Sequence, residues 1–218
     1  MILHVVERAL RLTPDVVVAT DDERIQSVVV QQGYEAIMTS GVHTSGTSRC
    51  LEAYELLGRE ADVLINLQGD EPFISEAHIR LLIDAFDDPS VEIATLAQPF
   101  PKEATNEDLA NPNAVKVVRA TSGRALYFSR SVIPYLRGVE EPWASKHEYL
   151  KHIGLYAFRT SLLRRLQSLP PSPLEQGESL EQLRWLSAGL QIQVQLTDET
   201  TIGVDTPEDL AHITTLIP

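Results

Sequence analysis

The sequence has a single cysteine, few basic residues and no long apolar run. The lone thiol, Cys50, excludes an intramolecular disulfide and is typical of a reducing compartment such as the cytoplasm. No stretch approaches the ~18 consecutive apolar residues of a membrane-spanning helix, so we expect no membrane insertion. The 18 lysines and arginines against 31 aspartates and glutamates give a net charge of −13. We therefore expect no nucleic acid partner, because phosphate backbones are bound through an excess of cations.

Several familiar catalytic and phosphate-binding motifs are also absent. The sequence contains neither the GxGxxG motif of dinucleotide-binding folds nor the GxxxxGK[ST] phosphate loop, and it has no GxSxG nucleophile turn. His147 and His152 are five residues apart, which turns their rings away from a common helix face, so a zinc protease is not expected. An anionic substrate must then be met by a few placed cations or by a bound metal ion.

Short apolar segments alternate with amphipathic segments of about ten residues along most of the chain. A stripe from Ile2 to Leu10 predicts a helix at the start, with no capping residue ahead of it. Further helices are predicted over 23–32, 48–57, 75–86, 161–167 and 180–190, and strands over 15–20, 34–39, 62–67, 91–100, 152–158 and 191–197. Segments 114–120 and 124–130 predict a hairpin. We expect one α/β domain over 1–218, with a mostly parallel sheet, helices on both faces and an antiparallel excursion.

Two acidic motifs stand where such a sheet places ligands. NLQGDEP follows a predicted strand and presents Asp70 in a constrained turn, at the carboxyl end where open α/β sheets bind ligands. GVDTPEDL places Asp205 just before a helix expected to begin at Thr206. Two such carboxylates suit Mg²⁺. A simple helix-entry turn explains Asp205 equally well from spacing alone.

A third motif, HTSGTSRC, is a small polar loop that leads into a predicted helix. Backbone N–H groups at a helix N-terminus bind phosphate and other polar ligand groups, and Arg49 adds a positive charge. Such a loop is also an ordinary helix cap, and its spacing does not decide between the two interpretations.

Seven ordered blocks of the sequence resemble one enzyme family. They are NLQGDEP, the HxSGTxR loop, NPNAVKVV, ALYFSRSxIP, KHIGLYAFR, SPLExxExLEQLR and GVDTPEDL. In this order they resemble the bacterial 3-deoxy-manno-octulosonate (Kdo) cytidylyltransferases. The resemblance implies a nucleotide-diphospho-sugar transferase-like fold related to type-A glycosyltransferases. It also implies Mg²⁺-dependent transfer of CMP from CTP to Kdo with release of pyrophosphate, in a cytoplasmic homodimer serving lipopolysaccharide biosynthesis.

The resemblance also implies roles for individual residues. Asp70 and Asp205 would hold the metal ion, and Arg130 would clamp the Kdo carboxylate. The nucleotide or sugar would be bound by Gln68, Ser45, Gly46, Thr47, Arg49, His152, Tyr156, Glu181 and Gln182. Each role has a plainer alternative. Arg130 suits a surface ion pair, His152 suits a satisfied core histidine, and the helix carrying Glu181 and Gln182 suits a solvated face.

Two departures from the family pattern bear on activity. Ser48 stands where the family usually carries an acid in SGT[DE]R, which removes a charge beside the nucleotide loop. The family's first strand and its basic PARxxSxRLPGKP loop are not in this sequence, so we expect an N-terminally incomplete cytidylyltransferase domain. Alternative hypotheses are an inactive truncated homologue that acts as a sugar-binding or dimerisation module, and a cytidylyltransferase for another acid sugar.

Overall fold

The structure of the protein is a computed structural model that describes residues 1–69, 71 and 74–199. Contacts divide these residues into two compact units, the first over 1–80 and the second over 81–199. The chain passes from the first unit to the second within α4 (Glu76–Asp84). The single domain expected over 1–218 stays a prediction. Asp70, Asp205 and the helix predicted from Thr206 lie outside the described residues.

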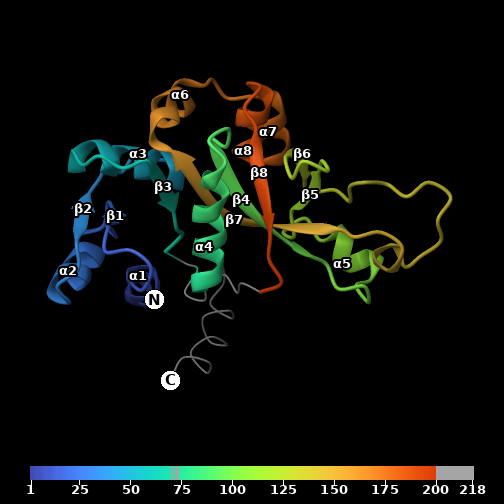
Figure 1. Cartoon of the computed structure of the whole chain (residues 1–218), viewed down its shortest axis with the longest axis horizontal. Coiled ribbons are helices and arrows are strands. Elements are labelled where there is room, and N and C mark those ends of the chain that lie inside the picture. Colours follow the sequence, from blue (N-terminus) through green and yellow to red (C-terminus); the bar gives the residue numbers. More distant parts are fainter. Residues whose placement is uncertain (70, 72–73, 200–218) are drawn as a thin grey trace. The chain divides into compact units, whose positions relative to one another are not determined.

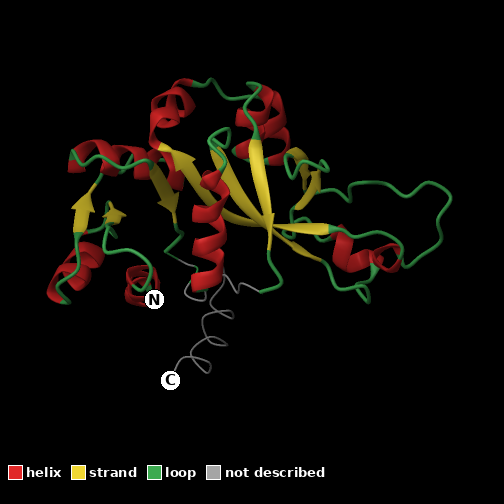
Figure 2. Ribbon diagram, viewed as in Figure 1, coloured by secondary structure: helices red, strands yellow, loops and turns green. Residues whose placement is uncertain are grey.

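The first unit begins with the helix that the apolar stripe predicts. In α1 (Ile2–Leu10) the buried side chains are Val5, Val6 and Ala9. Strands β1 (Val18–Thr20) and β2 (Ala36–Met38) pair in parallel and are connected by α2 (Glu23–Gln31), a βαβ arrangement that Figure 2 shows beside α1. One apolar cluster joins α1, β1 and α2, because Val6, Val18 and Val29, one from each element, pack together.

In the rest of the first unit, the polar HTSGTSRC loop leads into a helix. Helix α3 (Gly46–Leu57) starts two residues earlier than predicted, because the Ser45 side chain caps it by accepting a hydrogen bond from the Ser48 N–H. It ends at Gly58, whose φ of 58° is the left-handed conformation that glycine adopts readily. Strand β3 (Val63–Asn66) follows and leads toward the NLQGDEP motif.

The second unit is built on a mixed sheet. Its strands lie in the order β6-β5-β7-β4-β8. Strands β4 and β8 pair in parallel, whereas β4–β7, β5–β7 and β5–β6 are antiparallel. The expected excursion is therefore a large part of this sheet, because the ten-residue strand β7 runs antiparallel to β4 and to β5. The strands are β4 (Ile93–Pro99), β5 (Lys116–Arg119), β6 (Ala125–Ser129), β7 (Leu150–Arg159) and β8 (Ile192–Leu196).

Short helices and one long loop complete this unit. The helices are α5 (Asn106–Ala110), α6 (Leu163–Ser168), α7 (Pro173–Glu178) and α8 (Gln182–Ser187). The sequence pattern misses α5 and α7, because capping boxes rather than apolar stripes define helices of five and six residues. The loop between β6 and β7 extends away from the sheet (yellow in Figure 1). Among the helices that the structure describes, none combines the length and apolar character needed to cross a membrane.

A buried aromatic group attaches α8 to the sheet. The Trp185 ring meets the rings of Tyr156 and Phe158 edge-on, with centroids 5.1 and 5.4 Å apart. Trp185 and Phe158 are among the largest fully buried side chains. Because β7 carries both partner rings, this packing fixes α8, and with it Gln182, against the middle of the sheet.

Candidate functional site

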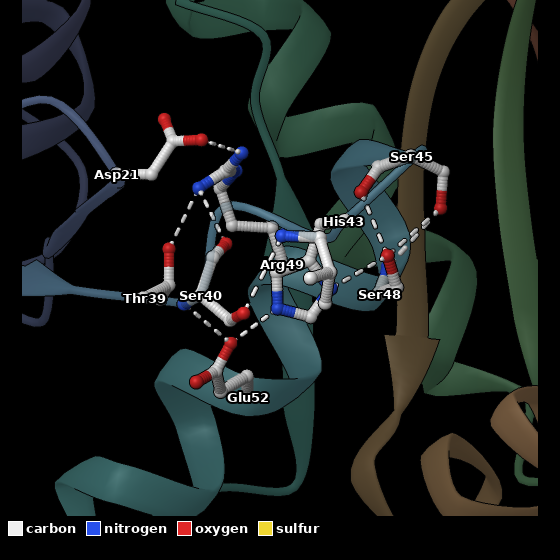
Figure 3. A network of polar contacts seen from close by, with 9 residues as sticks. Asp21, Thr39, Ser40, His43, Ser45, Ser48, Arg49 and Glu52 are labelled. Atoms are coloured by element: carbon white, nitrogen blue, oxygen red, sulfur yellow. Dashed lines mark hydrogen bonds and ion pairs between the residues drawn. The ribbon is translucent and has the colours of Figure 1, made fainter.

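Hydrogen bonds fix the start of α3. The Ser45 hydroxyl accepts from the Ser48 N–H at 3.3 Å, and the Ser48 hydroxyl donates to the Ser45 carbonyl at 3.0 Å. Figure 3 shows both serines at the first turn of the helix. The N-terminus of a twelve-residue helix presents backbone N–H groups and the positive end of its dipole, which favours an anionic or polar ligand group.

Gly46 lets two amide side chains approach the same turn. A Cβ atom at this position would lie 2.9 Å from Gln68 Nε2 and 3.1 Å from Asn66 Nδ2. Gln68, which the family pattern assigns to substrate, therefore lies beside Gly46 in the structure. Thr47 is buried in the same turn. The structure thus brings Ser45, Gly46, Thr47 and Gln68 together.

The Arg49 guanidinium links α3 to the ends of the two parallel strands. It donates to Thr39 Oγ1 at 2.8 Å and forms an ion pair with Asp21 at 3.0 Å (Figure 3). Thr39 and Asp21 follow β2 and β1 directly. The structure thus places Arg49 in the framework that holds the loop, beside the residues assigned to the nucleotide.

His43 and Glu52 form a second support for this loop; the sequence analysis includes His43 in the HTSGTSRC motif but does not single out Glu52. His43 Nδ1 lies 3.0 Å from Ser48 Oγ, while His43 Nε2 is hydrogen-bonded to the Glu52 carboxylate (Figure 3). The hydrogen bond from His43, together with one from the Ser40 N–H, lowers the pKa of Glu52. The only available signal was spacing, since Glu52 lies four residues after Ser48 on one helix face.

In the second unit, His152 and Tyr156 lie on one face of β7, as their spacing predicts. Their ring centroids are 5.4 Å apart, and His152 Nε2 lies 3.0 Å from Thr95 Oγ1. Burial of the ring lowers the pKa of His152 to about 3, so the imidazole is neutral at physiological pH. A neutral ring suits hydrogen bonding to sugar hydroxyls. The same contacts also describe a satisfied core histidine.

Two buried polar atoms, one on β7 and one on α8, have no protein partner among the described residues. Within the described part of the chain, Tyr156 Oη and Gln182 Nε2 are buried and make no hydrogen bond. The two residues are only 8% and 5% exposed. Burial, and to a lesser extent the Glu181 carboxylate, raise the pKa of Tyr156, while Thr95 opposes the shift without forming a well-directed hydrogen bond. Unsatisfied buried polar groups are costly and uncommon in native proteins, so these two indicate a ligand.

Arg130, for which the family pattern implies a clamp on the Kdo carboxylate, follows β6 in the second unit, and that role stays a prediction. Its guanidinium donates to three backbone carbonyls, those of Pro112, Glu178 and Ser179. The interpretation as a surface ion pair is not what the structure shows, because the neighbouring Glu178 carboxylate accepts from the Arg130 backbone N–H at 2.8 Å.

The predicted metal ligands lie outside the described residues. Neither Asp70 nor Asp205 has a described position. In the parts of the chain with described positions, no group of three or more His, Cys, Asp or Glu side chains is arranged to hold a metal ion.

Comparisons with known proteins agree with this geometry. A family model described as Cytidylyltransferase matches residues 1–192. A 3-deoxy-manno-octulosonate cytidylyltransferase of Porphyromonas gingivalis is 55% identical over 211 residues, covering 96% of this chain and 83% of the relative. The solved structure of CMP:2-keto-3-deoxy-manno-octonic acid synthetase complexed with CTP has a TM-score of 0.89 at 44% identity, covering 99% of this chain and 86% of that one. A putative glucose-1-phosphate thymidylyltransferase from Bacillus anthracis shares the fold alone, with a TM-score of 0.63 at 16% identity over 99% of this chain and 81% of that one.

The mixed α/β fold, the helix N-terminus with its polar loop and the shared architecture define a nucleotidyltransferase. This confirms the predicted fold class and enzyme class. The chain belongs to the 3-deoxy-manno-octulosonate cytidylyltransferase family, as the seven sequence blocks indicate.

Proposed function

We propose that this chain transfers CMP from CTP to Kdo. The anomeric hydroxyl of Kdo attacks the α-phosphorus of CTP, the new C–O–P linkage forms, the bond to the β-phosphate oxygen breaks, and pyrophosphate leaves. Support comes from the relatives' names and from the CTP in the related solved structure. The observation that carries the sugar side is the pair of buried orphan groups, Tyr156 Oη and Gln182 Nε2.

The first turn of α3 is the proposed nucleotide side. Ser45, Gly46 and Thr47 present backbone N–H groups and hydroxyls, and Gln68 adds an amide at the same turn. Arg49 holds this loop through Thr39 and Asp21 and adds positive charge near it. CTP therefore meets a preorganised turn, so little loop ordering opposes binding.

The proposed sugar side lies between β7 and α8. Tyr156 Oη and Gln182 Nε2 donate to sugar hydroxyls, which satisfies two of the buried atoms that have no hydrogen-bond partner among the described residues. The neutral His152 ring and the Glu181 carboxylate add further contacts. A site built from hydrogen-bonding groups discriminates strongly against a sugar that lacks a matching hydroxyl, since a buried polar group then stays unpaired.

Mg²⁺ is the proposed cofactor, held by Asp70 and Asp205. Two carboxylates completed by substrate phosphates and water are the donors that Mg²⁺ prefers, so the chemistry of the donor set fits. When bound, the ion neutralises charge on the phosphates. We further propose that the protein works in the cytoplasm as a homodimer and serves lipopolysaccharide biosynthesis.

Pyrophosphate release by the purified 218-residue chain tests the function. We expect release that requires CTP, Kdo and Mg²⁺ together, with Kdo turned over faster than a sialic acid. No release under any condition would favour the inactive, sugar-binding homologue. Equal or better turnover of the sialic acid would support the cytidylyltransferase for another acid sugar.

Removal of one hydroxyl oxygen, that of Tyr156, tests the proposed sugar-binding site. Tyr156→Phe removes the orphan hydroxyl and keeps the ring packing against Trp185. We expect the KM for Kdo to rise about tenfold, equivalent to one hydrogen bond of about 1.4 kcal/mol, with the KM for CTP unchanged. Tyr135→Phe, at a ring that is 72% exposed, is the matched control. An unchanged KM for Kdo in Tyr156→Phe would place the sugar elsewhere.

A further inference from the structure

A β-bulge places the Thr95 hydroxyl beside backbone carbonyls in the middle of the second unit's sheet. Along β4 and β7, Thr95 lies opposite Tyr156, whereas the next residue, Leu96, lies opposite Ile153. The two residues of β7 between these partners therefore have no counterpart on β4. Bulges interrupt the regular ladder and often re-aim side chains beside a functional site. Thr95 itself is completely buried.

The hydroxyl proton of Thr95 is committed to the backbone of this bulge. Thr95 Oγ1 lies 2.8 Å from the Leu155 carbonyl oxygen and 3.2 Å from the Ile153 carbonyl oxygen. Carbonyl oxygens only accept hydrogen bonds, and a threonine hydroxyl has one proton to donate. If that proton pointed elsewhere, two carbonyl oxygens would face the hydroxyl oxygen with no proton between them. The hydroxyl therefore donates to these carbonyls.

This hydrogen bond determines which nitrogen of His152 carries the proton. His152 Nε2 lies 3.0 Å from the same Thr95 hydroxyl oxygen. Because the hydroxyl gives its proton to the backbone, it accepts from Nε2, and Nε2 is the protonated nitrogen. Burial lowers the pKa of His152 to about 3, so the ring holds a single proton at physiological pH. Its other nitrogen, Nδ1, is then a hydrogen-bond acceptor.

Two aromatic rings pack against the His152 ring, while Nδ1 is left for a ligand. The Phe128 ring meets it edge-on with centroids 5.0 Å apart, and the Tyr156 centroid lies at 5.4 Å. Nδ1 has no hydrogen-bond partner among the described residues, and His152 is only partly buried. The Tyr156 hydroxyl on the same face of β7 is an orphan donor. An acceptor and a donor on one face suit neighbouring sugar hydroxyls, which both donate and accept.

We propose that Thr95 is a positioning residue of the sugar site, which keeps the His152 ring protonated on Nε2 so that Nδ1 accepts a hydrogen bond from a hydroxyl of the acid sugar. This rests on the proposed function and gives the contact a direction. An acceptor nitrogen discriminates against a sugar whose hydroxyl at that place is missing or replaced by a group that cannot donate, such as fluorine.

Nitrogen-15 NMR of the histidine rings tests this direction in the full chain. Protonated and unprotonated ring nitrogens resonate in separate ranges, and His152→Gln identifies the His152 signals by their loss. We expect the wild type to carry the proton on Nε2 at neutral pH. Addition of CTP, Mg²⁺ and the anomeric deoxy analogue of Kdo, which has no attacking hydroxyl, should shift the Nδ1 signal more than the Nε2 signal. A proton on Nδ1 in the free wild type, or a ligand-induced shift at Nε2 with none at Nδ1, would overturn the proposal.

Two substitutions at Thr95 separate positioning from packing. Thr95→Val keeps the branched shape without the hydroxyl, so we expect the proton to be shared between both ring nitrogens. The KM for Kdo should rise about fivefold, the loss of one neutral hydrogen bond, while kcat and the KM for CTP stay within about twofold. Thr95→Ser keeps the hydroxyl and should restore the protonated Nε2 and the KM for Kdo. Thr121→Val, at an exposed turn between β5 and β6, is the matched control. A Thr95→Val protein with the wild-type proton position and KM for Kdo would contradict the positioning role.

The two levels of failure are distinguishable. A wild-type protein that releases no pyrophosphate from CTP and Kdo contradicts the proposed function, while the proton position in its His152 ring still tests the hold of Thr95 on that ring. A wild-type protein that turns over Kdo with the proton on Nδ1 contradicts only the positioning role. Thermal unfolding shows whether each variant is folded, and the wild-type NMR signals decide the question if Thr95→Val is not.

Discussion

The buried imidazole of His152 should make the free energy of unfolding depend on pH. Its ring lies against Phe128, with centroids 5.0 Å apart, and its Nε2 lies beside the Thr95 hydroxyl. Burial lowers its pKa from 6.5 to about 3. Above pH 6.5 both the folded and the unfolded chain carry a neutral imidazole, and the full stability is present. As the pH falls from 6.5 toward 3, only the unfolded chain binds the proton, so the free energy of unfolding decreases.

The loss of stability can be calculated from the difference between the pKa of His152 in the unfolded and in the folded chain. One pKa unit corresponds to about 1.36 kcal/mol, and protonation of the unfolded state alone would cost about 2 kcal/mol between pH 7 and pH 5. The residue as a whole is only half-buried, and solvent near it reduces this value. We therefore expect His152 to account for about 1–2 kcal/mol of lost stability over these two pH units.

Urea unfolding at several pH values measures this contribution. His152→Gln keeps an amide donor near the position of Nε2 and does not titrate, so the wild type should lose about 1–2 kcal/mol more than the variant from pH 7 to pH 5. His147→Gln, at an exposed histidine, should follow the wild type. Other titrating groups are shared, so the difference between the curves isolates His152. Parallel curves for the wild type and His152→Gln would refute a buried, neutral imidazole.

Three further predictions concern single side chains. In Gly46→Ala the new methyl group would lie 2.9 Å from Gln68 Nε2, so the amide must move, and we expect a several-fold higher KM for CTP in the pyrophosphate assay with an unchanged KM for Kdo. Lys116→Met removes the ammonium that donates to the Arg130 carbonyl, whereas the Asn111 carbonyl still accepts from the Ala114 N–H, so we expect the free energy of unfolding in urea to fall by about 1–3 kcal/mol. Burial raises the pKa of the Cys50 thiol to about 12, so native protein at pH 8 should react with a thiol reagent far more slowly than urea-unfolded protein, and equal rates would contradict this.

Local features of the fold were predictable where one segment carries its own signal. The apolar stripe from Ile2 predicts α1, and the start of α3 was missed by two residues because a serine side chain caps it. The mixed sheet was harder to predict. Periodicity marks a strand at 152–158 but does not say which strands it joins, and the antiparallel place of β7 between β4 and β5 depends on contacts far apart in the sequence.

In the candidate site too, local spacing was predictable from the sequence, whereas contacts between distant segments were not. Spacing puts His152 and Tyr156 on one face of a strand, and the structure confirms that their rings are neighbours. Whether a polar atom has a partner depends on the surroundings, so no pattern distinguishes the Tyr156 hydroxyl, which has none among the described residues, from the Tyr149 hydroxyl, which donates to the Pro134 carbonyl at 2.8 Å. Arg130 shows the same limit, since its partners are backbone carbonyls and carry no residue-type signal.

In this protein, the polar side chains that hold the fold have hydrogen-bond partners within the protein, whereas Tyr156 Oη and Gln182 Nε2, which are proposed to bind the sugar, have none among the described residues. Arg49 and Arg130 give their donors to strand ends, carbonyls and a carboxylate of the protein itself. The neutral donors of Tyr156 and Gln182 are the buried ones that the described residues leave unsatisfied. Neutral donors suit hydroxyls, whereas a nucleoside triphosphate approaching a chain of net charge −13 needs compensating cations. Because Thr39 and Asp21 already accept from the Arg49 guanidinium, that compensation rests more heavily on the metal ion proposed at Asp70 and Asp205. Activity should therefore fall more steeply on removal of Mg²⁺ than on loss of either orphan donor.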